Sequence, residues 1–120
     1  SDIMVVPHAI GQRVWFETGE GPRLQPVADS QSLDGLTAFD ENKVSGTLQA
    51  LRTLHAGLPP TVALIGFCGA PWTLATYMVA GRGTPDKGPA KALAAADPQL
   101  FADLIDRVVE ASISYLVAQV

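Results

Sequence analysis

The hydrophobic residues of this chain follow a helical spacing in most places and form one short continuous run. From residue 43 to residue 54, apolar side chains recur every three to four positions, which predicts a helix that ends near Gly57. The next apolar run, residues 61–65 (TVALI), is hydrophobic on both faces, as a central strand of a parallel sheet is. Pro71 then suits the first turn of a second helix, and Gly81 suits its end.

The carboxyl-terminal third carries two more helical patterns. Residues 82–88 are predicted to form a loop, and the alanine-rich residues 89–96 a short helix. Asp97-Pro98 combines a capping side chain with a proline, which predicts the start of a longer helix. The apolar stripe of this helix comprises Phe101, Leu104, Ile105, Val108, Ser112 and Leu116.

The amino-terminal third is less regular. Residues 2–6 are apolar enough for either a strand end or a buried helical turn, and Pro7 is expected to interrupt them. Residues 13–16 and 23–24 are predicted to pair as a hairpin across a turn rich in glycine. Residues 25–42 are polar and mixed, and we expect a surface excursion with up to one helical turn.

A helix, a buried strand and further helices in succession predict an α/β fold with a parallel sheet. One clear central strand cannot form a closed sheet, and a complete (β/α)8 barrel needs about 250 residues. The 120 residues would therefore supply part of such a barrel, as one internal piece (1–120) of a single domain. The absence of an initiator methionine and of a helix stop signal at Val120 also suggests a piece of a longer protein.

Composition narrows the class of protein. The chain is 48% hydrophobic and 17% charged, which is typical of a globular domain. A net charge of −4 disfavours a nucleic-acid-binding protein, and no apolar run is long enough for a membrane span. The single cysteine, Cys68, cannot form an internal disulfide and favours a reducing compartment. His8 and His55 have no partners at metal-ligand spacing, so no metal site is predicted.

One segment is far more specific than the rest. Residues 66–81, GFCGAPWTLATYMVAG, match at every specified position a signature of the uroporphyrinogen decarboxylase family, which the chain therefore resembles. Three further segments resemble the family and occur in its order. They are residues 1–7 (SDIMVVP), 9–11 (AIG) and 19–24 (GEGPRL).

The resemblance implies a fold and a reaction. Members of this family are (β/α) barrels that decarboxylate the four acetate side chains of uroporphyrinogen III to give coproporphyrinogen III in tetrapyrrole and haem synthesis. They use neither a metal nor an organic cofactor. They are cytosolic or plastidic, and many are homodimers. For this chain, the resemblance implies a small-molecule substrate, with neither nucleic acid nor membrane as a partner.

The resemblance also implies site residues. Asp2 matches the aspartate that binds the pyrrole N–H groups of the substrate, and Tyr77 matches a tyrosine lining the same cleft. Arg82 directly follows the signature and is a candidate to meet substrate carboxylates. The family's amino-terminal arginines, a later serine or threonine, and a histidine near the carboxyl end lie outside this chain, so the piece alone is expected to be inactive.

The chemistry suits these residues. Loss of CO₂ from a pyrrole side chain becomes feasible once the ring is protonated on carbon and cationic, and a fixed carboxylate stabilises that cation. We therefore expect Asp2 to act as an anion and not as the proton donor. Two alternatives remain at this stage. One is a related cobalamin-linked methyltransferase barrel, which would need a zinc site, and the other is a non-catalytic structural piece.

Overall fold

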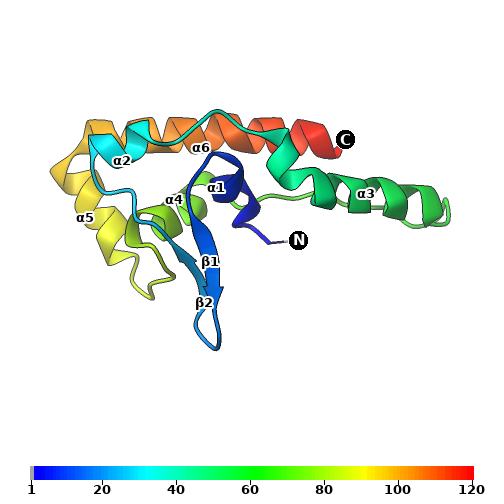
Figure 1. Ribbon diagram of the computed structural model, residues 1–120, viewed down its shortest axis with the longest axis horizontal. Helices are drawn as coiled ribbons and strands as arrows, with labels where there is room; N and C mark the ends of the chain where they lie inside the picture. The colour runs from blue at the N-terminus through cyan, green and yellow to red at the C-terminus, as the bar shows by residue number, and fades with distance from the viewer. Residues whose placement is uncertain (1) are drawn as a thin grey trace.

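The long helix α6 (Pro98–Gln119) is the element around which the rest of the chain is assembled. The computed structural model describes residues 2–120, and in it helices α1, α2, α3, α4 and α5 all contact α6 (Figure 1). Leu104 and Val108, four residues apart, are fully enclosed on the inner face of α6. The stripe predicted from the sequence thus forms the centre of the core, although Leu116 at its end is exposed.

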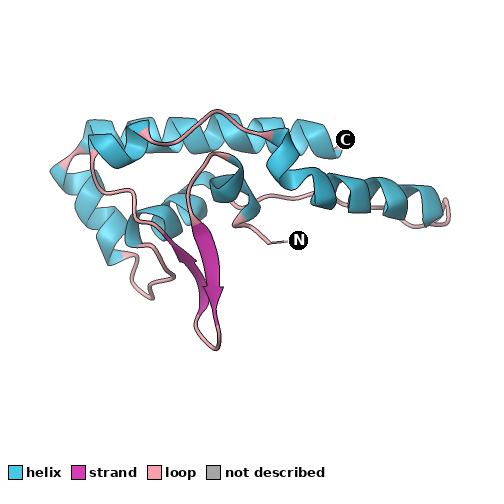
Figure 2. Cartoon of the chain, viewed as in Figure 1, coloured by secondary structure: helices cyan, strands magenta, loops and turns pink. Residues whose placement is uncertain are grey.

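The elements follow one another in a mostly helical order (Figure 2). They are α1 (Val5–Ala9), β1 (Val14–Glu17), β2 (Gly21–Leu24), α2 (Ser30–Asp34), the 3-10 helix η1 (Glu41–Val44), α3 (Ser45–Gly57), α4 (Pro71–Ala80), α5 (Gly88–Ala96) and α6. Helix α3 extends past the carboxyl end of α6 (Figure 1), and Leu48 is its one buried residue.

The predicted helix boundaries in the second half of the chain are confirmed. Pro71 is the first residue of α4, and Gly81 ends it in the left-handed conformation (φ +75°) that glycine adopts without strain. The Asp97 carboxylate accepts the backbone N–H of Leu100 at 3.1 Å and so caps α6. Local signals were sufficient here because each boundary depends on a single capping or helix-stopping residue.

The predicted hairpin is also confirmed. Strands β1 and β2 pair antiparallel, with Trp15 opposite Arg23. The hairpin is fastened to the end of α4, since the Leu24 N–H donates to the Gly81 carbonyl at 2.9 Å. Gln12 adds a second attachment, because its Nε2 donates to the Met78 carbonyl at 3.2 Å. Residues more than fifty positions apart in the chain are thereby held together.

The predicted strand at 61–65 is not formed. Within residues 2–120 the two strands of the hairpin are the only strands, and 61–65 runs as an irregular segment. Ile65 is 82% exposed, and Val62 and Leu64 are also exposed. A strand exists only where a neighbouring strand completes its hydrogen bonds, and no described residue supplies one. The expectation of a parallel sheet is therefore wrong for this structure, which is a mixed helix and strand fragment.

Two smaller expectations also need correction. Pro7 does not interrupt a helix but lies inside α1 as its third residue. The N–H groups of a first helical turn have no partner within the helix, so the missing N–H of Pro7 costs little there. The 25–42 region is only partly a surface excursion. It forms α2, and its Val27, Leu33 and Leu36 are buried in the core.

Candidate functional site

Two of the three predicted site residues line one pocket. This pocket, which we call the Tyr77 pocket, lies between the hairpin and the loop after α4 and has a volume of about 370 Å³. Tyr77 belongs to the last turns of α4, and Arg82 is the first residue after Gly81. The residues lining it are Glu20, Pro22, Arg23, Tyr77, Arg82, Gly83, Thr84 and Pro85.

The left-handed turn at Gly81 sets the shape of this pocket. The Gly81 N–H donates to the Tyr77 carbonyl at 2.8 Å, and this bond reverses the chain at the end of α4. The chain then passes over the phenol ring. A Cβ atom built at Gly83 would lie 3.3 Å from the Tyr77 hydroxyl oxygen. The absence of a side chain at Gly83 thus allows this close approach.

The loop is fastened on its other side by Lys87. The Lys87 ammonium donates to the Thr84 carbonyl at 2.8 Å. The Thr84 hydroxyl oxygen is buried and has no hydrogen-bond partner within residues 2–120. A donor without a partner therefore belongs to a residue that lines the pocket.

The hairpin contributes charged groups from its tip. The Arg23 guanidinium forms an ion pair with the Glu20 carboxylate three residues earlier. The two side chains are 27% and 58% exposed, respectively. An ion pair this accessible to water holds its partners only weakly. Arg23 therefore remains available to another carboxylate that enters the pocket.

Asp2 lies elsewhere, at the entrance to α1. Its carboxylate accepts the Met4 N–H at 2.7 Å, and its carbonyl accepts the Val5 N–H. The side chain is exposed to solvent, and the bond to Met4 holds its orientation. Asp2 is not among the residues that line the Tyr77 pocket. The structure thus brings Tyr77 and Arg82 together and leaves Asp2 outside their pocket.

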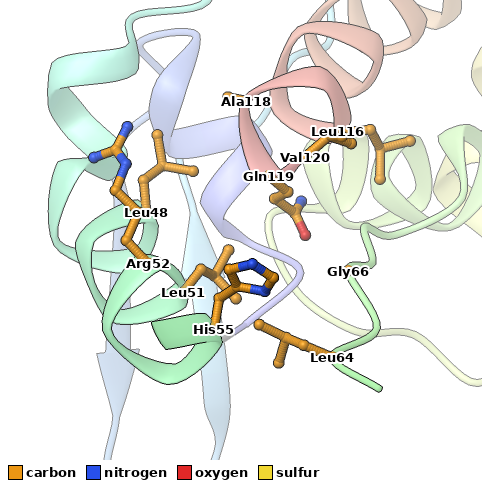
Figure 3. Close-up of a pocket in the computed structure, with 10 residues that line it drawn as sticks. All are labelled: Leu48, Leu51, Arg52, His55, Leu64, Gly66, Leu116, Ala118, Gln119 and Val120. Carbon is orange, nitrogen blue, oxygen red and sulfur yellow. The ribbon is translucent and has the colours of Figure 1, made fainter. Parts of the chain in front are cut away.

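A larger cavity of about 610 Å³ lies between α3, residues 64–66 and the carboxyl end of α6 (Figure 3). Its wall is mainly apolar, with Arg52 and His55 on the α3 side. The Gln119 side chain points across it towards Gly66 (Figure 3). The Gln119 amide donates to the carbonyl of Phe67 and accepts its N–H, both at 3.0 Å. None of the predicted site residues lines this cavity.

Other candidate chemistry is limited. Across residues 2–120, no three His, Cys, Asp or Glu side chains gather closely enough to hold a metal ion. No helix in the same range is long and apolar enough to cross a membrane. Cys68 is half-buried and packs against the core. Trp72 meets the Phe101 ring edge-on, with 5.9 Å between the ring centres, so packing accounts for its position.

Sequence reasoning missed the hairpin's contribution to the pocket. The sequence predicts that Arg23 and Glu20 belong to a hairpin, but it does not indicate the side of the molecule on which that hairpin packs. The signal that fixes it is the buried Gln12 side chain, whose Nε2 reaches the Gln25 and Met78 carbonyls. The sequence around Gln12 does not indicate which distant carbonyl groups its side chain will bond, so this contact could not have been predicted.

Comparison with known proteins agrees with the signature. The family model for uroporphyrinogen decarboxylase (URO-D) matches residues 1–120. The uroporphyrinogen decarboxylases of Ruegeria pomeroyi and Paracoccus denitrificans are 51% and 50% identical to this chain over 122 residues, and that of Sphingopyxis alaskensis is 44% identical over 120 residues. Each match covers 100% of the chain and 35–36% of the relative, so the chain spans about a third of their length. The chain belongs to the uroporphyrinogen decarboxylase family.

Proposed function

We propose that the protein containing this chain decarboxylates the four acetate side chains of uroporphyrinogen III to give coproporphyrinogen III, in tetrapyrrole and haem synthesis. The match of the family model over residues 1–120 carries this proposal. The activity is assigned to the whole protein, because the chain spans about a third of the relatives it matches. In that protein, residues 61–65 would become a strand of a (β/α)8 barrel once neighbouring strands complete their hydrogen bonds.

The proposed roles of the site residues follow from their chemistry. Asp2 would accept the pyrrole N–H groups and stabilise the ring cation that forms before CO₂ leaves. A carboxylate already aligned by the Met4 N–H needs little reorganisation for this task. Tyr77 would donate its hydroxyl to the substrate, and Arg82 would meet a substrate carboxylate. The substrate supplies its own electron sink, so these roles require no cofactor.

The same proposal covers the wider biology of the protein. We place it in the cytoplasm, in agreement with its single, half-buried cysteine. We expect it to act on a small molecule, without nucleic acid or membrane as a partner. We also expect the intact protein to be a homodimer, as family members often are.

A chimeric enzyme tests the function directly. This chain would replace the matching third of the Ruegeria pomeroyi decarboxylase, and the porphyrin products of uroporphyrinogen turnover would be separated by chromatography. We expect coproporphyrinogen to form. Asp2→Asn should lower the rate about 10²- to 10³-fold, the usual effect of removing one preorganised charge. Asp34→Asn, an equivalent change at the exposed end of α2, is the control.

Two results would count against the proposal. A chimera that folds but yields no decarboxylated product would remove the assigned activity. Full turnover by the Asp2→Asn variant would remove the role given to Asp2.

Tyr77→Phe should raise KM more than it lowers kcat, because the hydroxyl is assigned to binding.

A further inference from the structure

The Tyr77 pocket concentrates positive charge in a chain whose net charge is −4. Two guanidinium groups line it, Arg23 from β2 and Arg82 from the loop, against the single carboxylate of Glu20. Lys87 adds a further cation to the same loop, where its ammonium holds the Thr84 carbonyl. A concave site with excess positive charge attracts anionic ligands, and arginine in particular recognises carboxylates with two parallel hydrogen bonds.

Two hydroxyl groups belong to residues that line the same pocket, those of Tyr77 and Thr84. Buried hydroxyl groups nearly always have a hydrogen-bond partner, so the exceptions need an explanation. The Thr84 Oγ1 has none within residues 2–120, and Thr84 lines this pocket. The Tyr77 hydroxyl lies against the same loop at Gly83. A hydroxyl can donate to a carboxylate oxygen, so the Tyr77 hydroxyl suits the ligand that the arginines favour, whereas the Thr84 hydroxyl is enclosed by protein.

The Glu20–Arg23 ion pair determines what a carboxylate entering the pocket would meet at Arg23. Glu20 occupies Arg23 with a carboxylate, the same group that the pocket would receive from a ligand. The pair is exposed, and Glu20 more than Arg23, so exchange of one carboxylate for another is inexpensive. A ligand carboxylate that reaches Arg23 would therefore meet Glu20 already bound there.

We propose that the Tyr77 pocket is a carboxylate subsite, in which Arg23 and Arg82 hold one acidic side chain of the substrate and Glu20 competes for Arg23. This inference rests on the proposed function, because the substrate assigned there is a polycarboxylate. It adds Arg23 to the binding residues. It also separates two tasks, since Asp2 serves the ring nitrogens whereas this pocket anchors the ring's periphery.

The experiment uses three single-residue variants of the chimeric enzyme. Arg23→Gln removes a ligand-binding cation, Glu20→Gln removes the competitor, and Arg13→Gln removes an equal charge from the same hairpin at a residue outside the pocket. Two quantities are measured for each variant. One is KM and kcat for uroporphyrinogen, and the other is the Kd of uroporphyrin, the stable oxidised form with the same carboxylates, followed by its absorbance.

The variants should move in opposite directions. Arg23→Gln should raise KM and Kd by roughly 3- to 10-fold with kcat unchanged, because a partly exposed charge-assisted contact is lost. Glu20→Gln should lower both, since Arg23 is then free. Arg13→Gln should leave both unchanged. This pattern would separate an anchoring role from a merely structural one, which would not produce tighter binding in any variant.

The outcomes distinguish this inference from the function on which it rests. If the chimera turns over and Arg23→Gln behaves like Arg13→Gln, the subsite is wrong while the activity stands. If no turnover occurs but the Kd values shift as described, the subsite stands and the assigned reaction fails. Weaker binding by Glu20→Gln would overturn the competition, and circular dichroism of each variant identifies any loss of fold.

Discussion

Replacing Gly81 by alanine should weaken the joint between α4 and the hairpin more than any comparable glycine change. Gly81 adopts φ +75°, where an L-residue costs about 1 to 2 kcal/mol. The new Cβ would also lie 2.6 Å from the Leu24 carbonyl oxygen and 2.9 Å from Pro26. Ordinary contact begins at 3.4 Å, so the hairpin must shift by several tenths of an ångström.

That shift has its own cost. The Leu24 N–H donates to the Gly81 carbonyl at 2.9 Å, and weakening this bond costs about 1 kcal/mol. Leu24 is fully buried, so its displacement also disturbs the core. The backbone strain and the weakened hydrogen bond add together, so we expect Gly81→Ala to lower the free energy of unfolding by about 2 to 4 kcal/mol.

Gly19 provides a matched control for the strain alone. It has φ +78°, almost the same as Gly81, but a Cβ there would meet nothing within 4 Å. Gly19→Ala should therefore cost only the strain, about 1 to 2 kcal/mol. Urea unfolding of the 120-residue chain, followed by far-UV circular dichroism, measures both variants. If Gly81→Ala is no more destabilising than Gly19→Ala, the contact with Leu24 does not constrain the joint.

Three further predictions concern two helix caps and one exposed apolar segment. Asp97→Ala should lower the free energy of unfolding in urea by about 1 kcal/mol, because the Leu100 N–H loses its cap; an unchanged midpoint would show that the cap contributes nothing. The backbone N–H of Ser32 and, second, its hydroxyl hold the pKa of the Asp29 carboxyl below its ordinary value. The ionised carboxylate therefore stabilises α2 fully above the pKa that Asp29 has in the unfolded chain. This stabilisation is lost as the pH falls through the pKa that Asp29 has in the folded chain. Proton NMR should show Ser32→Ala raising the pKa of Asp29, and no rise would refute the assignment. The chain should self-associate through its exposed 62–67 segment, and Ile65→Lys should reduce the mass seen by sedimentation; equal association would place the contact elsewhere.

The extent to which the fold was predictable depends on the range of the interactions involved. Helix α4 was predictable because proline and glycine mark its two ends within the same short segment. The 61–65 segment was not, because an apolar run specifies that a strand is possible but cannot supply the neighbours that make it one. The prediction that Pro7 interrupts a helix is wrong for a related reason. Whether a proline breaks a helix depends on where that helix starts, and α1 begins only two residues earlier.

The candidate site shows the same division. Tyr77 and Arg82 are close in sequence, and their joint position in one pocket follows from the turn at Gly81 that the sequence predicts. The arrival of Arg23 depends on long-range packing of the hairpin, for which no local pattern exists. Asp2 was assigned by resemblance alone. Its relation to Tyr77 stays a prediction, to be tested with the chimeric enzyme.

The amide of Gln119 has a consequence for how the chain loosens on heating. This one side chain imitates an adjacent strand by holding both backbone groups of Phe67, and it lies in the final turn of α6. Terminal turns fray well before a core melts. Each fraying event releases the backbone of Phe67, so the already exposed 62–67 stretch gains the freedom to pair with a second chain through local and not global opening. Aggregation should accordingly begin below the melting temperature, and deuterium uptake at Phe67 should track uptake at the carboxyl terminus.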